Sequence, residues 1–244
     1  MFKKTLLINK HGDEFTGWSE NSFKPATGEL IFNTAMTGFV EILSDPSYIN
    51  QIVTFTSSHI GNYGLSRIDF ESNKPKIEAA VGNTFSHSPS SWRSEKSLTS
   101  WLSEYEIPFS GGFDVRSVTK HLRDNGSSMY ALGVDVEKSD LLELLNTATD
   151  ILGDNSALTA GSLNLNRHMP DGKVGILDLG AKQSIVSVLE NLNFQVVSIK
   201  PDVSAENILS MNLKGLLISN GPGDPRSLID VIITVTNLIG KIPI

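Results

Sequence analysis

Residues 216–225 read LLISNGPGDP, a short apolar run that leads directly into a turn rich in glycine and proline. Residues 173–180, KVGILDLG, have the same form, and a third apolar run, QVVSIK, occupies residues 195–200 between them. Helical patterns separate these runs. Strands that alternate with short helices are typical of βαβ units and a parallel sheet. The C-terminal part of the chain therefore predicts an α/β fold with a doubly wound parallel sheet.

The helices of this part are predicted from spacing and end signals. The first has apolar residues at helical intervals on one face, at Ile185, Val188, Leu189 and Leu192. Ser204 is placed to cap the second, and the third covers residues 227–240. KIPI at 241–244 then begins a fourth strand. Because a usual domain has about 100–150 residues, these roughly 70 residues amount to half of a doubly wound domain.

The first 152 residues predict a separate, mixed α/β domain with more turns. ELIFNTAM and QIVTFTSS are strand candidates rich in β-branched and aromatic residues, with the turn DPSY at 45–48 between them and HIGNYG as a second turn. Helices are expected over residues 97–107, 115–126 and 141–150. The polar stretch 153–172 has three glycines and no sustained period, which predicts a linker. The domains are therefore 1–152 and 173–244, joined by 153–172.

Composition excludes several classes of function. The 244 residues carry a net charge of −7, so they offer no clustered positive charge for nucleic acid or an anionic membrane. No apolar run approaches the roughly 20 residues that span a bilayer, and the N-terminal apolar run is too short for a signal peptide. We expect a cytoplasmic protein. The absence of cysteine excludes disulfides, thiolate metal sites and a cysteine nucleophile within these residues.

The turn GPGDP follows a strand of the predicted parallel sheet, where ligands bind beyond the carboxyl ends of the strands. Gly221 and Gly223 permit close backbone approach, and the flanking prolines fix the geometry. Such a loop could aim N–H groups at a developing negative charge, as an oxyanion hole does. On pattern alone, however, an ordinary strand-to-helix turn is favoured, since clusters of Gly, Pro and Asp mark turns in general.

Nucleotide and metal sites find no support in the motifs. The loop DLGAKQS has one glycine where a dinucleotide fingerprint needs three, and no P-loop occurs. Asp178 ends a strand, and capping of the next helix or contact with Lys182 is favoured over a functional role. No two histidines have the spacing of metal ligands; they are His11, His59, His87, His121 and His168. The sequence also contains no G-x-S-x-G nucleophile elbow. His121 is expected at the surface, and the Ser47 hydroxyl is favoured as a stabiliser of its own turn.

Several blocks together resemble one family. GELIFNTAMTGFVEILSDPSYINQIVTFTSSHIGNYG at 28–64 closely resembles the N-terminal domain of the small, glutamine-hydrolysing subunit of carbamoyl-phosphate synthase. FDVRSVTKHLRDNG at 113–126 is similar to a helical region of that family. ILDLGAKQSI at 176–185 and LLISNGPGDP resemble the start of its flavodoxin-like class I glutamine amidotransferase domain. The resemblance covers nearly the whole chain and is weakest across 127–172.

The resemblance implies a division of labour between two subunits. The small subunit hydrolyses L-glutamine with a Cys-His-Glu triad and passes ammonia to a large subunit. That partner uses ATP, Mg²⁺ and bicarbonate to make carbamoyl phosphate for arginine and pyrimidine biosynthesis, and this chain itself takes no cofactor or metal. Carried over by motif, Ser47, Gly221 and Gly223 bind the glutamine, with Gly221 as the oxyanion donor.

Departures from the family set the expectation for activity. The family's nucleophile elbow and its later histidine and glutamate fall beyond Ile244, so the resemblance implies no catalytic residue in this chain, and Val115 replaces the usual threonine. Two hypotheses follow. One is a truncated small subunit, catalytically incomplete, with an unfinished amidotransferase domain; the other is a natural non-catalytic module that binds glutamine or the large subunit. The first is favoured, because a chain that ends inside a parallel sheet exposes a strand edge.

Overall fold

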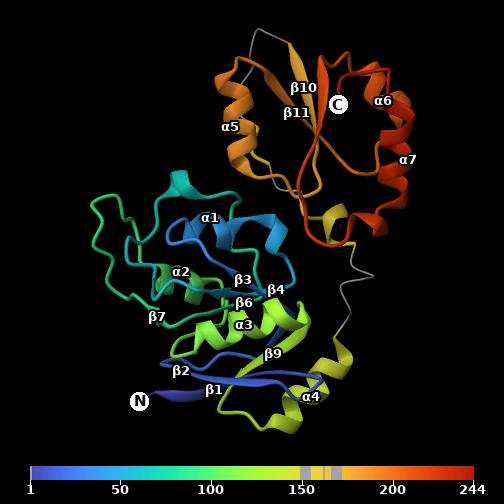
Figure 1. Ribbon diagram of the computed structural model, residues 1–244. Coiled ribbons are helices and arrows are strands. Elements are labelled where there is room, and N and C mark those ends of the chain that lie inside the picture. Colours follow the sequence, from blue (N-terminus) through green and yellow to red (C-terminus); the bar gives the residue numbers. More distant parts are fainter. Residues whose placement is uncertain (1, 149–154, 162, 166–171) are drawn as a thin grey trace. The chain divides into compact units, whose positions relative to one another are not determined.

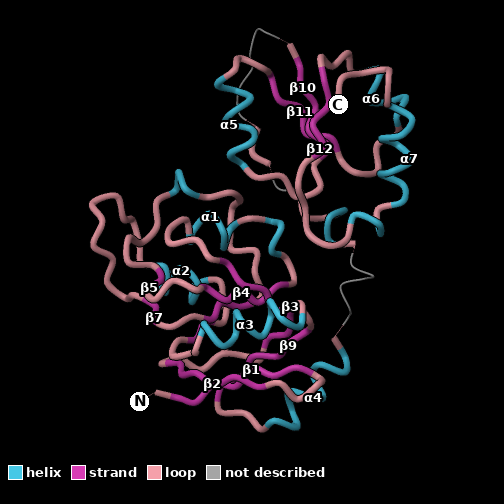
Figure 2. The backbone as a smooth tube through the Cα atoms, in the orientation of Figure 1, coloured by secondary structure: helices cyan, strands magenta, loops and turns pink. Residues whose placement is uncertain are grey.

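The computed structural model describes residues 2–148, 155–161, 163–165 and 172–244 (Figures 1 and 2). Contacts divide the chain into two compact units, which are described separately. Unit 1 consists of Met1–Ser44, Asn50–Phe70 and Lys74–Asp150. Unit 2 consists of Asp45–Ile49, Glu71–Asn73 and Ile151–Ile244. Two short segments of the N-terminal half thus belong to unit 2.

Unit 1 is built on a seven-stranded mixed sheet in the order β2-β1-β9-β3-β4-β6-β8. Its strands are β1 Lys3–Asn9, β2 Glu14–Ser19, β3 Ala26–Asn33, β4 Gln51–Phe55, β6 Ala79–Val81, β8 Phe109–Ser110 and β9 Met129–Val134. A separate pair joins β5 His59–Ile60 to β7 Thr84–Phe85. Strands β3, β4, β6 and β8 run parallel, and the pairs that involve β1 and β9 are antiparallel.

The two edges of this sheet are joined by backbone hydrogen bonds. Trp18 N donates to Gly111 O at 2.8 Å, and Gly111 N donates to Trp18 O at 2.9 Å. Trp18 lies in the edge strand β2, and Gly111 directly follows β8 at the opposite edge. The bridge therefore leaves less unpaired backbone at the sheet edges, which is where strands are prone to pair with other chains.

Four α-helices accompany the sheet in the described part of unit 1, together with the 3-10 turn η2 Arg67–Asp69. They are α1 Phe39–Ser44, α2 Leu98–Glu104, α3 Val115–Asn125 and α4 Lys138–Thr147. Helix α3 contributes Val118 and Leu122 to the core formed with the sheet residues Leu30, Ile52 and Tyr130. Helix α4 packs against a second cluster through Leu141 and Leu145. Sheet residues that point to opposite faces, such as Leu7 and Ile8, enter different clusters, as strand alternation requires.

The sequence predicted part of unit 1 correctly. Strands at ELIFN and QIVTF, helices α2 to α4, and the C-terminal stop of α3 at Gly126, with φ of 83°, are confirmed. Residues 149 and 150 of the predicted third helix lie outside the described residues. Helix α1 and strands β1, β2 and β9 were not predicted. The segment HIGNYG, expected as a turn, begins with the short strand β5.

Unit 2 confirms the predicted doubly wound arrangement. Strands β10 Lys173–Leu177, β11 Gln195–Ile199 and β12 Gly215–Ile218 form a parallel sheet in the order β11-β10-β12. Helices α5 Gln183–Asn191, α6 Ala205–Ser210 and α7 Ile229–Leu238 alternate with them, beside the 3-10 turns η1 Pro46–Tyr48, η4 Ser156–Leu158 and η5 Pro225–Ser227. Because the strand order reverses about β10, the carboxyl ends of β10 and β12 form a topological switch point.

The helices of unit 2 cover both faces of its sheet (Figure 1). Ile176 packs in one cluster with Val186 of α5, whereas its neighbour Leu177 packs in another with Ile208 of α6 and Val231 of α7. The predicted cap of α6 is confirmed, because the Ser204 side chain accepts from Asn207 N at 3.3 Å. Its two packed faces give unit 2 a core of its own.

Three details of unit 2 differ from expectation. In α5, Val188 and Leu192 of the predicted apolar face are 58% and 60% exposed, while Val186, outside that face, is fully buried. Residues 241–244, where a fourth strand was expected, form no strand, although Leu216 N of β12 donates to Pro243 O at 2.9 Å. Within the expected linker, 155–161 includes η4, and Ala157 is buried in the core of unit 2. Linker residues 153, 154, 162 and 166–171 lie outside the described residues, so the linker stays a prediction.

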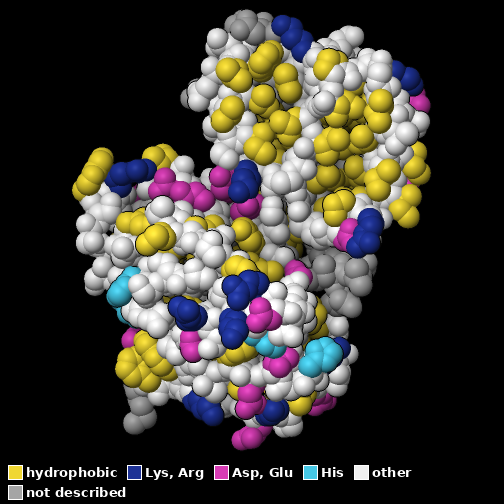
Figure 3. Space-filling view, in the orientation of Figure 1, with side chains coloured by type: hydrophobic (Ala, Val, Ile, Leu, Met, Phe, Trp, Pro, Cys, Tyr) yellow, Lys and Arg dark blue, Asp and Glu magenta, His cyan; other side chains and the backbone are white. Residues whose placement is uncertain are grey.

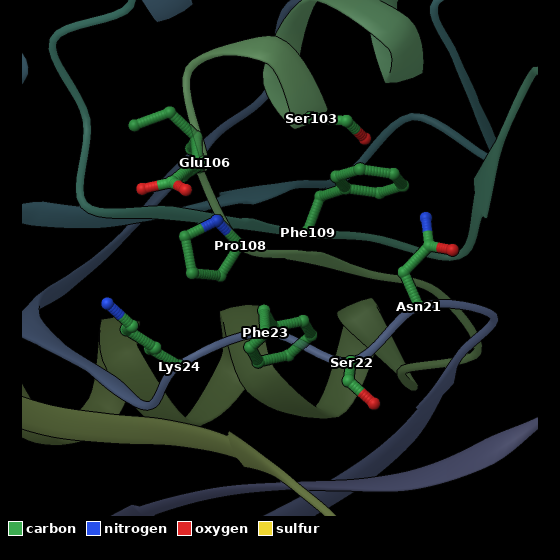
Figure 4. Close-up of a pocket in the computed structure, with 9 residues that line it drawn as sticks. Asn21, Ser22, Phe23, Lys24, Ser103, Glu106, Pro108 and Phe109 are labelled. Carbon is green, nitrogen blue, oxygen red and sulfur yellow. The ribbon is translucent and has the colours of Figure 1, made fainter.

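Each unit also shows a distinct surface feature. In unit 1, a cavity of about 570 Å³ has an aromatic and aliphatic wall with polar side chains around it (Figure 4). Its lining consists of Asn21, Ser22, Phe23, Lys24, Ser103, Glu106, Ile107, Pro108 and Phe109. In unit 2, apolar side chains gather on the visible surface (Figure 3), and the exposed ones on or just beyond α7 are Ile229, Ile232, Ile233 and Ile239.

Candidate active site

The turn that follows β12 requires its two glycines for different reasons. A Cβ added to Gly221 would lie 2.1 Å from the Leu179 carbonyl oxygen, so no other side chain fits without a shift of the backbone. Gly223 has φ of 77°, in the left-handed region that glycine adopts without steric cost. At Gly221 the turn therefore packs too closely against the neighbouring loop for a side chain, and at Gly223 it needs a backbone conformation that favours glycine.

The loop that follows β10 is held by a buried carboxylate. Asp178 Oδ1 accepts from Gly180 N at 3.1 Å and from Ala181 N at 2.9 Å. Lys182, the N-cap residue of α5, makes no side-chain cap and does not pair with Asp178. The expectation that Asp178 caps the helix or contacts Lys182 is wrong, because its carboxylate is used by the amides of its own loop.

Lys182 instead pairs with Asp45, which belongs to unit 2 although it lies far away in the sequence. Lys182 Nζ lies 2.7 Å from Asp45 Oδ2, and the Asp45 side chain is only 3% exposed. Burial alone would lower the pKa of Lys182, but the hydrogen bond and charge of Asp45 oppose it, and the net effect raises that pKa. A buried carboxylate needs such a partner, since an unpaired buried charge is costly.

Asp45 also shapes the turn that carries Ser47. Its Oδ1 accepts from Ser47 N at 2.9 Å and thereby caps η1, which begins with Pro46. An aspartate before a proline is a suitable start for such a turn. The predicted DPSY turn is confirmed, but its stabilising side chain is that of Asp45 rather than that of Ser47.

Ser47 meets the turn after β12 through a direct hydrogen bond. Asn220 Nδ2 donates to Ser47 Oγ at 2.6 Å, and Asn220 is the residue that precedes Gly221. Two of the three predicted site residues, Ser47 and Gly221, thus flank one contact within unit 2. Gly223 lies two residues further along the same turn and is exposed.

The backbone amides of this turn remain available as donors. Within the described part of the chain, neither Gly221 N nor Gly223 N forms a hydrogen bond. Unpaired N–H groups held by a rigid loop can stabilise negative charge on a bound carbonyl oxygen without reorganisation. The arrangement at the switch point is therefore suited to a ligand that presents a carbonyl oxygen to the turn and a second polar group to Ser47.

Among the described residues, no three His, Asp or Glu side chains gather to hold a metal ion. His121, expected at the surface, is partly buried, and its Nε2 lies 3.6 Å from Asp13 Oδ2. His168 lies outside the described residues. No helix in the described ranges is long and apolar enough to cross a membrane.

Sequence reasoning missed three residues that build this site: Asp45, Lys182 and Asn220. Asp45 had a local signal, because Asp-Pro is a common start of a turn. Asn220 had only its place before the glycine turn, and the Lys182–Asp45 pair joins positions without any shared period. Contacts of this kind depend on the tertiary fold.

Comparison with known proteins agrees with these observations. The family model of the carbamoyl-phosphate synthase small chain, CPSase domain, matches residues 7–132, and that of class I glutamine amidotransferase matches residues 175–244. A carbamoyl phosphate synthase small chain from Staphylococcus epidermidis is 39% identical over 100% of this chain and 66% of its own length. The small chain of Listeria monocytogenes is 36% identical over 99% of this chain and 66% of its own length.

A pyrimidine-specific small chain of carbamoyl phosphate synthase from Halalkalibacterium halodurans is 38% identical over 99% of this chain and 67% of its own. The chain thus spans about two thirds of the length of the curated relatives it matches. The first family model alone matches more than half of the 244 residues, and over the aligned stretch more than a third of the residues are identical to those of these relatives. This chain belongs to the carbamoyl-phosphate synthase small-chain family.

Proposed function

We propose that the chain provides the glutamine-binding part of a glutamine-hydrolysing carbamoyl-phosphate synthase. In this proposal, the amides of Gly221 and Gly223 face the side-chain carbonyl of L-glutamine, with Gly221 as the oxyanion donor. Ser47 binds the other end of the substrate. The released ammonia serves a large subunit that uses ATP, Mg²⁺ and bicarbonate, and the product feeds arginine and pyrimidine biosynthesis.

The hydrogen bond from Asn220 Nδ2 to Ser47 Oγ is the observation that carries this proposal. It joins a residue of the N-terminal half to the glycine turn at the switch point of the parallel sheet. A turn that served only to connect β12 to α7 would need neither the unpaired amides nor a serine from position 47. The family relationship independently supports a glutamine amidotransferase role for unit 2.

These 244 residues can bind glutamine in this scheme but cannot attack it by the family's chemistry. They contain no cysteine, and the thiolate is the nucleophile of class I amidotransferases. An oxyanion site lowers a barrier only when a nucleophile adds to the carbonyl. We therefore expect the isolated chain to bind glutamine and to release no ammonia.

Ligand-observed NMR titration of the 244-residue chain with L-glutamine, up to tens of millimolar, tests the proposal, with an ammonia assay on the same samples. Ser47→Ala is expected to weaken binding about tenfold or more, since hydrogen bonds to charged groups contribute about 1.5–3 kcal/mol. Ser187→Ala, the same change on exposed α5, is the control and should leave binding unchanged. Absence of binding to the unmodified chain contradicts the proposal, and ammonia release contradicts the role given to these residues.

A further inference from the structure

The side-chain amide of Asn220 joins three segments of unit 2. Its Nδ2 lies 2.6 Å from Ser47 Oγ, 3.3 Å from Gly180 O and 3.5 Å from Asp45 Oδ1. The Gly180 carbonyl and the Asp45 carboxylate are acceptors only. They therefore require the nitrogen, and not the oxygen, of the Asn220 amide on this side.

This orientation determines what the Ser47 hydroxyl can do. Because Ser47 Oγ accepts from Asn220 Nδ2, its own hydrogen is not used in that bond. The Asp45 carboxylate accepts from Ser47 N, and no described residue accepts from the Ser47 hydroxyl. The hydroxyl hydrogen thus remains for an acceptor on a ligand.

The orientation of Asn220 is kept although it leaves a polar atom without a partner. Asn220 Oδ1 is buried and, within the described residues, forms no hydrogen bond. Buried polar atoms without partners are rare, and each one calls for an explanation. The contacts of the amide nitrogen supply it, because turning the amide over would set its oxygen against Gly180 O and the Asp45 carboxylate.

We infer that Asn220 is a positioning residue that makes Ser47 a hydrogen-bond donor toward the α-carboxylate of the bound amino acid. The inference rests on the proposed function, in which the side-chain carbonyl of glutamine faces the glycine amides. The α-carboxylate is then the anionic acceptor left for Ser47. Asn220 itself acts through Ser47 and does not touch the substrate.

Asn220→Asp tests this while keeping the size of the side chain, although it also sets a carboxylate oxygen against Gly180 O and the Asp45 carboxylate. The ionised carboxylate that this substitution introduces cannot donate to Ser47; it accepts the Ser47 hydroxyl hydrogen and withdraws that hydrogen from the ligand. We expect the Kd for L-glutamine to rise at least about tenfold at pH 8, the scale of one lost charged hydrogen bond. The loss should shrink as the pH falls and the new carboxyl becomes protonated, because a protonated acid can again donate.

A ligand without a carboxylate separates positioning from general damage to the fold. 4-Aminobutanamide keeps the amide and the amine of glutamine but has no carboxylate for Ser47. The unmodified chain, Ser47→Ala and Asn220→Asp should therefore bind it with equal affinity. An equal loss for both ligands in Asn220→Asp would overturn the inference.

The double variant Ser47→Ala/Asn220→Asp completes the test. If Asn220 acts through Ser47, the double variant should bind glutamine no more weakly than Ser47→Ala alone; additive losses overturn the inference.

Asn207→Asp on the exposed face of α6 is the matched control, and thermal melts show that each variant folds. Should Asn220→Asp not fold, Asn220→Ser, which is too short to reach Ser47, is expected to show a smaller loss that is still confined to the ligand with a carboxylate, because Ser47 then lacks its orienting donor but keeps its hydroxyl hydrogen; an equal loss for both ligands would overturn the inference. Failure of the unmodified chain to bind glutamine overturns the proposed function together with this inference, whereas the other outcomes overturn this inference alone.

Discussion

The two units cover their apolar residues to different extents. Unit 1 joins the edges of its sheet through the Trp18–Gly111 bridge and buries a core that includes Leu30, Ile52 and Tyr130. The described part of unit 2 has three strands, and it leaves exposed the apolar side chains of Val188, Leu192, Ile229, Ile232, Ile233 and Ile239, on or next to its helices. The most exposed apolar side chains of unit 1, Met36, Ile68 and Trp92, lie outside its strands and α-helices. Unit 2 nevertheless holds the candidate site in a dense set of hydrogen bonds. We therefore expect the loops of unit 2 to fix the geometry of the site, and the covering of each sheet to set the stability of its unit.

Hydrogen exchange tests this comparison most directly and should show the largest effect. We expect amides in β10, β11 and β12 to exchange about a hundredfold faster or more than those in β3, β4 and β9, because opening free energies follow buried contacts. Mass spectrometry of peptides from each strand provides the measurement. Equal protection in the two sets would show that the exposed apolar surface does not weaken unit 2.

Leu177→Ala should then locate the stability of unit 2 in its core. Leu177 is fully buried between the sheet and helices α6 and α7, and such truncations cost about 2–5 kcal/mol. Leu192→Ala is the matched control, since the Leu192 side chain is mostly exposed and its loss should change stability by at most about 0.5 kcal/mol. Urea denaturation followed by a probe in unit 2 measures the unfolding free energy of both variants. A large loss in Leu192→Ala would instead indicate that Leu192 packs into the core.

The residues of α5 show why the predicted apolar face and the buried face of the helix differ. Ile185 and Leu189 pack against the core, as the spacing indicated, but the third member of the stripe is Val186 rather than Val188. Both sets fit a helical period, and the sequence alone does not say which stripe faces the sheet. The strands at 173–177 and 215–218 were clearer, because short, nearly uninterrupted apolar runs are typical of a parallel sheet covered on both faces.

The site shows where prediction from local pattern stops. Gly223 could be predicted from turn chemistry, because its backbone has positive φ. The meeting of Ser47 with Asn220, 173 positions apart, follows no period, and only the family resemblance pointed to Ser47 and the glycine turn together. Asp45 and Lys182 form their pair through tertiary structure, and no sequence pattern indicated it.

Lys182→Met should weaken the attachment of the Ser47 turn to unit 2. Removing the ammonium leaves the buried Asp45 carboxylate without its ion pair, which in a fully buried pair costs about 3–5 kcal/mol. Because the Lys182 side chain is 38% exposed, solvent screening reduces this, and we expect about 1–2 kcal/mol. Lys200→Met, on an exposed lysine, is the control.

The pH dependence of this loss has a definite sign. The pKa of Lys182 is raised in the folded state, so its stabilisation is fully present below the unfolded-state value of about 10.4 and disappears as the pH rises through the folded-state pKa. The unfolding free energies of Lys182→Met and the unmodified chain should therefore differ at pH 7 and converge at strongly alkaline pH. A difference that persists unchanged there would assign the effect to the aliphatic stem of the lysine.

The smallest effect is expected at the start of α5, which is capped from a distant segment. Gln183 N donates to Glu71 O at 3.0 Å, and Ser184 N donates to Glu71 Oε2 at 2.9 Å, whereas the N-cap residue Lys182 makes no side-chain cap. Glu71→Ala removes the carboxylate from the first turn and should cost about 1 kcal/mol, as the loss of a helix cap does. Asp202→Ala, an exposed acidic residue of the same unit, is the control.

The location of this loss distinguishes the two units. If the segment Glu71–Asn73 is a structural part of unit 2, faster hydrogen exchange in Glu71→Ala should appear at the first turn of α5 and leave α3 of unit 1 unchanged. A change confined to unit 1 would instead mean that the segment belongs there. In that case the segments borrowed from the N-terminal half would not stabilise the unit that holds the candidate site.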